Sequence, residues 1–198
     1  MGVRTRDFAN SGSNGINWIK KSEHNQTGNT ATSFQFNTGL YEASDGFNIY
    51  RIVGRIGGTQ GTGNANLRVR WINSSGSIVT SGYYSGNNTV HSGGSHVIGS
   101  AGNDSVGFVL KDTPTTAAMY ADLYYVPNDH HMYGLARYHN QSTQMGVTLT
   151  SIRNSTSLAY GLNFTNGGGD NITTIDFTVY GAKIDGSCLL YTSPSPRD

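Results

Sequence analysis

The sequence predicts an all-β protein, an antiparallel β-sandwich with a jelly-roll-like topology. Strong helix formers are scarce, since Glu occurs only at Glu23 and Glu42, while Gly, Asn, Ser and Thr fill the chain. Several segments alternate apolar and polar residues with a period of two, which is typical of half-buried strands. The 12 Tyr and 7 Phe indicate a packed core and argue against disorder.

Four segments show this alternation most clearly. Their predicted inward-facing sets are Leu67, Val69 and Trp71; Val106, Phe108 and Leu110; Met145, Val147 and Leu149; and Leu158, Tyr160, Leu162 and Phe164. Residues 47–56 and 119–126 are largely apolar on both faces, which predicts central strands. Ile175, Phe177 and Val179 form the last strand of the series.

Clusters of Gly, Asn and Ser separate these segments and predict turns. They fall at residues 57–64, 73–77, 85–88, 92–95, 153–156 and 165–171. Strands at this spacing, without helices between them and without a repeat of fixed period, favour one sandwich over a propeller or solenoid.

The chain divides into an N-terminal arm (1–15), a β-sandwich domain (16–187) and a C-terminal tail (188–198). The tail matches, codon for codon, the translation of a transposase-type sequencing adapter, so we expect it not to be native. This assignment leaves the body without cysteine, so no disulfide or cysteine-based metal site is expected.

Charge and hydropathy exclude several classes of function. The net charge is +1 and the basic residues are scattered, so no nucleic-acid partner is expected. No apolar run is long enough to cross a bilayer, and the first ten residues lack the apolar stretch of a signal peptide.

Four segments together resemble a family of structural domains encoded by marine tailed phages. They are SFQF at residues 33–36, FNIYRIVGRI at 47–56, NLRVRW at 66–71 and IDFTVYGAK at 175–183. The resemblance implies a jelly-roll-like sandwich in a tail, tail-fibre or other virion protein, with attachment to host-surface glycans. The arm shows none of the collagen-like or coiled-coil shaft that is common in complete fibres.

Few residues suit catalysis. A glycosidase needs two carboxylates across a cleft, and none of the six Asp residues considered sits in a recognisable motif. Asp122, in an otherwise apolar strand, and Asp129 are the candidates, although Asp122 fits a structural carboxylate better. His130 and His131 suggest a metal site, but neighbouring strand residues point to opposite faces, and a turn after Pro127 and Asn128 is favoured. No catalytic residue, metal or cofactor is therefore predicted.

Aromatic residues next to turns give the best signal for binding, because Tyr and His combine a flat apolar body with a polar tip. The candidate ligand-binding residues are Tyr83, Tyr84, Tyr124, Tyr125, His130, His131 and Tyr133. In each Tyr pair on a strand, one ring is expected to point into the core.

These observations predict a non-enzymatic virion structural domain at the particle surface. Its expected partners are other virion subunits, in a homo-oligomer such as a trimer, and host-surface glycans. Two alternatives remain: a carbohydrate-active hydrolase or lyase such as a capsule depolymerase, and a secreted or cell-surface bacterial lectin-like or adhesin domain.

Overall fold

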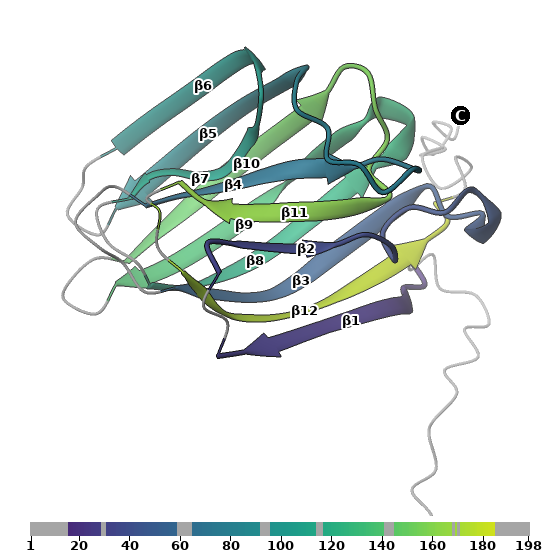
Figure 1. Cartoon of the computed structure of the whole chain (residues 1–198), viewed down its shortest axis with the longest axis horizontal. Helices are drawn as coiled ribbons and strands as arrows, with labels where there is room; N and C mark the ends of the chain where they lie inside the picture. Colours follow the sequence, from purple (N-terminus) through teal and green to yellow (C-terminus); the bar gives the residue numbers. More distant parts are fainter. Residues whose placement is uncertain are drawn as a thin grey trace, which may run out of the picture.

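The computed structural model describes residues 16–28, 31–58, 65–91, 96–113, 117–140, 145–167, 169 and 171–184. They form two antiparallel sheets packed face to face, which confirms the predicted β-sandwich (Figure 1). The predicted arm (1–15), the predicted non-native tail (188–198) and the predicted turn at 92–95 lie outside the described residues.

The larger sheet has eight strands and the smaller has four. The order in the larger sheet is β1 (Ile19–Thr27), β12 (Ile172–Ala182), β3 (Ile49–Gly58), β8 (Ala117–Val126), β9 (His131–Asn140), β10 (Met145–Asn154), β5 (Tyr83–His91) and β6 (His96–Asp104). The order in the smaller sheet is β2 (Ser33–Phe36), β11 (Gly161–Asn166), β4 (Ala65–Ile72) and β7 (Gly107–Thr113). Two short 3-10 helices, η1 (Ala43–Asp45) and η2 (Pro127–Asp129), lie in loops. Among the described residues, no helix is long and apolar enough to span a membrane.

Eight strands follow the jelly-roll topology, in which a long hairpin rolls up so that its pairs alternate between two sheets. The pairs are β1 with β12, β2 with β11, β3 with β8 and β4 with β7. Hairpin β5–β6 is inserted between β4 and β7, and hairpin β9–β10 follows β8. These two hairpins, here called the extension, lie side by side and widen the larger sheet (Figure 1).

The centre of the jelly-roll half is aromatic. Trp71 is fully buried and makes edge contacts with Tyr83 and Tyr125, whose ring centroids lie 5.5 and 5.9 Å from its own. The Tyr83 hydroxyl accepts a hydrogen bond from the Trp71 backbone N–H (2.6 Å), and the Tyr125 hydroxyl accepts one from the Ala159 N–H (2.8 Å). The Tyr125 phenol therefore fixes loop backbone to the core, and the Tyr83 phenol, which also donates to the Val79 carbonyl (3.1 Å), connects β4 to the loop that follows it.

The interior of the extension is polar, and this contradicts the prediction for residues 145–149. In β10 the polar residues Thr148 and Thr150 are buried, whereas Val147 and Leu149 are 41% and 56% exposed. The inward hydroxyls are satisfied: Thr148 pairs with Thr89 (2.8 Å between the Oγ1 atoms), and Thr150 donates to the Phe108 carbonyl (2.9 Å). Because these hydrogen bonds remove the cost of burying Thr, strand β10 packs with its apolar side outward.

Two further predictions are wrong. Residues 85–88, predicted as a turn, lie in the middle of β5, where Ser85 and Asn87 face inward. In β7 the side chain between the predicted inward positions, Val109, is fully buried, while Phe108 is half-buried beneath the Arg68 guanidinium. Register shifts between β4 and β7 disturb the simple alternation there.

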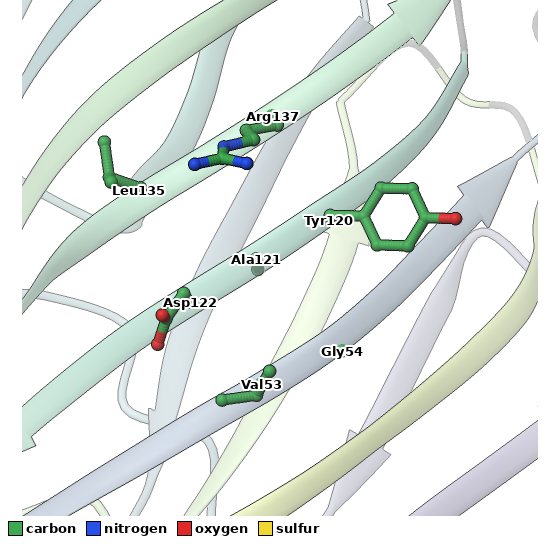
Figure 2. A pocket seen from close by; sticks show the side chains of 7 residues that line it. All are labelled: Val53, Gly54, Tyr120, Ala121, Asp122, Leu135 and Arg137. Carbon is green, nitrogen blue, oxygen red and sulfur yellow. The ribbon is translucent and has the colours of Figure 1, made fainter.

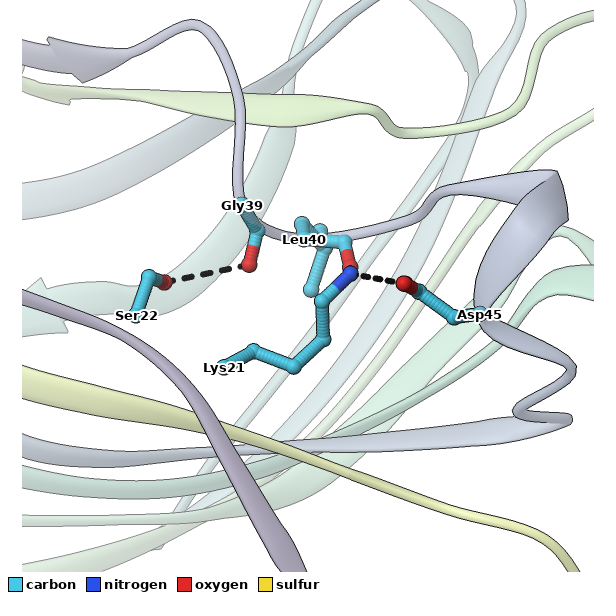
Figure 3. Close-up of polar contacts among 5 residues, drawn as sticks. All are labelled: Lys21, Ser22, Gly39, Leu40 and Asp45. Carbon is cyan, nitrogen blue, oxygen red and sulfur yellow. Dashed lines mark hydrogen bonds and ion pairs between the residues drawn. The ribbon is translucent and has the colours of Figure 1, made fainter.

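A partly buried ion pair holds β1 to the loop that follows β2. Lys21 occupies a bulge in β1, between the register positions of Lys20 and Ser22. Its ammonium group pairs with Asp45 and donates to the Leu40 carbonyl (3.0 Å), as Figure 3 shows. The bulge thus turns the Lys21 side chain inward, where its contacts connect the edge strand β1 to the loop that follows β2.

Candidate functional site

The outer face of the larger sheet, which points away from the smaller sheet, is the candidate site. Every described strand belongs to one of the two sheets, so no described strand covers this face. Nine large hydrophobic side chains are exposed among the described residues. Six of them lie on this face: Tyr84, Val90, Tyr120, Tyr133, Val147 and Leu149. An exposed apolar surface of this kind is typical of a contact surface.

An aromatic–arginine cluster, made of Trp18, Arg51, Tyr124, Tyr133 and His131, lies on this face. Tyr124 of β8 and Tyr133 of β9 are direct cross-strand partners, and their rings stack with centroids 5.7 Å apart and planes 18° apart. The Arg51 guanidinium lies 5.6 Å from the Tyr124 centroid, and the Trp18 ring meets Tyr124 edge-on at 6.0 Å. Since Tyr124 has neighbours on several sides, Tyr133, which is 40% exposed, is the more open ring.

Arg51 is fixed by an ion pair with Asp122. Its Nε and Nη2 atoms each donate to one carboxylate oxygen, both at 2.8 Å. These hydrogen bonds are the main cause of the raised pKa of Arg51. The two-point geometry fixes the guanidinium in its position over the Tyr124 ring, within the distance of a cation–π contact. It also occupies both oxygens of Asp122.

His131 closes the other end of the cluster. Its ring lies 5.8 Å from that of Tyr133, and its Nε2 atom is 2.7 Å from the Ser151 hydroxyl. Burial lowers the pKa of His131; nearby Arg153 lowers it further, while Asp129 opposes the shift. A neutral imidazole with one fixed nitrogen is therefore favoured at neutral pH.

The predicted turn after Pro127 is present. Residues 127–129 form η2, and His130 ends it with φ 52° and ψ 33°. His130 is the non-glycine residue with positive φ in the described part of the chain, a conformation that His tolerates better than most residues. It directs the chain into β9, so that His131 starts the strand on the outer face.

The seven predicted ligand-binding residues thus separate into three groups. Tyr124, Tyr133 and His131 come together in the cluster, with His130 in the adjacent turn. Tyr84 is exposed on the same face, but on β5, two strands from β9. Tyr83 and Tyr125 are wrong as ligand residues, because both are fully buried and burial raises the pKa of each phenol.

Sequence reasoning missed Trp18, Arg51 and Tyr120. Arg51 interrupts an otherwise apolar predicted strand. This could have indicated the solvent-facing side of the strand, because a charged side chain there is expected to point toward solvent. Trp18 gave no signal, since it precedes β1 in sequence and meets Tyr124 only through the fold.

Two shallow hollows lie on the outer face, on either side of Tyr120. One, of about 230 Å³, is lined by Val53, Gly54, Tyr120, Ala121, Asp122, Leu135 and Arg137 (Figure 2). The other, of about 360 Å³, is lined by Val53, Gly54, Arg55, Tyr120, Asp176, Phe177 and Thr178. Gly54 belongs to both, and a Cβ there would lie 2.1 Å from the Asp176 carbonyl oxygen, so only glycine fits.

The arrangement suits binding. Flat aromatic rings, the fixed guanidinium of Arg51 and open hollows provide stacking surfaces and hydrogen-bond donors. Within the described residues, no three His, Cys, Asp or Glu side chains converge in a way that could hold a metal ion.

Comparison with known proteins gives little more. No protein-family profile matches the chain, and no curated protein matches it. One solved structure is similar, the CBM2 module of the evolved Dit of Lactobacillus casei BL23 phage J-1. Its identity to the chain is 12% and its TM-score 0.28, with 87% of this chain and 79% of that one covered.

Proposed function

We propose that the chain is a non-enzymatic structural domain of a tailed-phage particle, in a tail or tail fibre, that makes its contacts through the outer face of the larger sheet. The observation that carries the proposal is the concentration of exposed apolar side chains on this face, six of the nine among the described residues. Strand β10 buries Thr148 and exposes Leu149. Leaving the Leu149 side chain in water forgoes the favourable free energy of burying apolar surface, unless a partner molecule covers it. The sequence resemblance to phage structural domains supports the virion as its location.

Within this face, the aromatic–arginine cluster is the proposed attachment site for host-surface glycans. Sugars offer apolar C–H faces and rings of hydroxyls, which suit the open ring of Tyr133 and the donors of Arg51. The cluster has no deep cavity, so a single site would bind weakly. Repetition of the site in an oligomer would raise the avidity by several orders of magnitude.

The proposed site for contacts with neighbouring subunits is an apolar patch in the extension, made of Val90, Val147 and Leu149. Val90 and Val147 are direct cross-strand partners, and Leu149 follows on the same side of β10. These side chains are 54%, 41% and 56% exposed. A homo-oligomer such as a trimer would bury them, and we expect Leu149→Lys to convert that oligomer to monomers.

The hydrolase alternative receives no support from the geometry of Asp122. Both carboxylate oxygens accept hydrogen bonds from Arg51, so the group is held in a structural ion pair. Asp129, the second candidate acid, lies exposed in η2. We therefore propose that the domain binds glycans without cleaving them.

The test is a glycan-array and cell-binding comparison of the domain with Tyr133→Ala and Trp18→Ala. Arg70→Gln, on the smaller sheet, is the matched surface control. We expect the two cluster variants to lose binding, the control to retain it, and host polysaccharide to release no reducing ends. Equal binding by all variants, or release of reducing ends that Asp122→Asn or Asp129→Asn abolishes, would overturn the proposal.

A further inference from the structure

A second row of side chains crosses the outer face beside the aromatic–arginine cluster. Arg55 of β3 is the cross-strand partner of Tyr120 of β8, which is the partner of Arg137 of β9. All three side chains are exposed, and Tyr120 is 58% exposed. Cross-strand partners have Cβ atoms about 5 Å apart, so an arginine stands on the strand to each side of Tyr120. The row lies four residues along β8 from Tyr124, on the same face of the strand.

Arg137 is the arginine of this row without a carboxylate as a cross-strand partner, since its partners are Tyr120 and Val147. Three ion pairs occur among the described residues, namely Lys20–Glu23, Lys21–Asp45 and Arg51–Asp122, and Arg137 belongs to none of them. The nearest carboxylate on the rim of its hollow, Asp122, already has both oxygens engaged by Arg51. Arg55 differs, because Asp176 stands directly opposite it on β12.

The hollow between Tyr120 and Arg137 has the dimensions of a subsite. In Figure 2 the Tyr120 ring leans toward β3, whereas the Arg137 guanidinium points along β9 toward Leu135; Ala121 lies on β8 and Gly54 on β3. Its volume of about 230 Å³ lies below the roughly 300–1,000 Å³ of pockets that enclose a drug-sized ligand. It therefore suits one sugar ring that rests on Tyr120 and places a substituent at Arg137.

We infer that this hollow is a subsite for an acidic sugar, with Tyr120 stacking on the ring and Arg137 binding its carboxylate or sulfate. The inference rests on the proposed glycan-binding function and adds the class of glycan. A guanidinium binds either anion through two parallel hydrogen bonds, and the exposed site makes the interaction sensitive to salt.

The experiment measures binding of the full chain to three probes by calorimetry: oligogalacturonate, the same oligomer with its carboxylates reduced to alcohols, and a sulfated galactan oligomer. The variants are Arg137→Gln and Tyr120→Ala, with Arg70→Gln on the smaller sheet as the control for loss of one positive charge. Thermal unfolding of each variant checks that it is folded.

We expect the domain to bind one or both acidic oligomers at least tenfold more tightly than the reduced one. Arg137→Gln should weaken acidic binding about tenfold and abolish the preference, whereas Arg70→Gln should not. Selective binding of either acidic oligomer supports the inference, and the pair of probes identifies the anion.

Equal binding of reduced and acidic oligomers, or equal effects of Arg137→Gln and Arg70→Gln, would overturn the acidic-sugar inference alone. The proposed function would then still stand if Tyr133→Ala lost binding to neutral glycans. Failure to bind any probe or any glycan on the array would overturn both.

Discussion

The two halves of the larger sheet bury opposite kinds of side chain. Beneath β3, β8 and β12 the interior is aromatic and aliphatic, with Tyr50, Phe177 and Trp71 at less than 4% exposure. Beneath β5 and β10 it is a set of Thr and Asn side chains that bond to one another, among them Thr89 with Thr148 and Thr150 with Asn87. The jelly-roll half is thus held by burial of apolar surface, and the extension by hydrogen bonds between inward side chains; within this described Thr and Asn set, the Asn87 Nδ2 atom alone is buried without a partner.

This difference explains why the outer face changes character across the sheet. In the jelly-roll half, strand β3 buries Ile52, while Arg51 is half-buried and Arg55 exposed on the outer face, as in an ordinary half-buried strand. In the extension, β10 buries Thr148 and exposes Leu149. A strand can place its apolar side toward solvent only if its polar side finds partners inside, and the apolar side is then free for contacts with other molecules.

The largest effect is expected in the jelly-roll half, for Trp71→Ala. Trp71 is fully buried between Tyr83 and Tyr125, so its loss should cost about 3–5 kcal/mol of the free energy of unfolding. Denaturant unfolding measures the change, and Trp18→Ala is the control, with an expected cost below about 1 kcal/mol. Similar costs for the two tryptophans would contradict the placement of the core.

In the extension, Thr89 and Thr148 form a pair suited to a double-mutant cycle. Each single change to Val should cost about 1–2 kcal/mol, because it leaves a buried hydroxyl without its partner. The double variant should be close to the parent, since both hydroxyls are then gone and the shape is kept. Additive costs in denaturant unfolding would show that the two hydroxyls do not depend on each other.

Leu149→Ser separates the two interpretations of β10. Because Leu149 is 56% exposed, the variant should change the free energy of unfolding by less than about 0.5 kcal/mol. If Leu149 faced the core, as alternation predicts, the cost would be about 2–5 kcal/mol or more. Denaturant unfolding is measured at a concentration where the domain is monomeric, so that loss of an oligomer contact of Leu149 does not add to the measured cost.

The smallest expected effect is a pH dependence of the free energy of unfolding, to which one histidine of the jelly-roll half and one of the extension contribute. Burial lowers the pKa of His24, in β1, and of His131, in β9, below the value near 6.5 expected in the unfolded chain. The folded state then binds fewer protons than the unfolded state as the pH falls below about 6.5, so stability decreases on acidification and is unaffected above it. Unfolding measured on both sides of pH 6.5 should show a weaker dependence in His24→Gln and in His131→Gln. A stability that rises on acidification would contradict the lowered values.

The sequence predicted the jelly-roll half well, except in β7, because its other strands follow the rule that apolar side chains face inward. The sandwich, the central strands around Ile52 and Leu123, and the turn at residues 73–77 are all present. The extension was mispredicted for the same reason. In β5 (YYSGNNTVH) the central residues SGNN are typical of a turn. They form a strand here because inward side chains of β5 find hydrogen-bond partners on β10.

The candidate site was predictable in part. A pair of adjacent tyrosines on a strand must point one ring each way, so strand geometry alone predicts one outward ring, which is Tyr124 in the structure, and one inward ring, which is Tyr125. Which ring faces outward, and which residues on other strands join it, depend on the register. Arg51 and Tyr133 are separated by many residues in sequence and meet at Tyr124 through the order β3–β8–β9.

Hydroxyl-radical labelling of the domain, free and bound to a glycan that it retains on the array, tests the use of the outer face most directly. We predict that Tyr120 and Tyr133 are labelled in the free domain and protected in the complex, while Ile78, which follows β4 of the smaller sheet, is labelled equally in both. Protection of Ile78 with no change at Tyr120 and Tyr133 would contradict the assignment of this face as the binding surface.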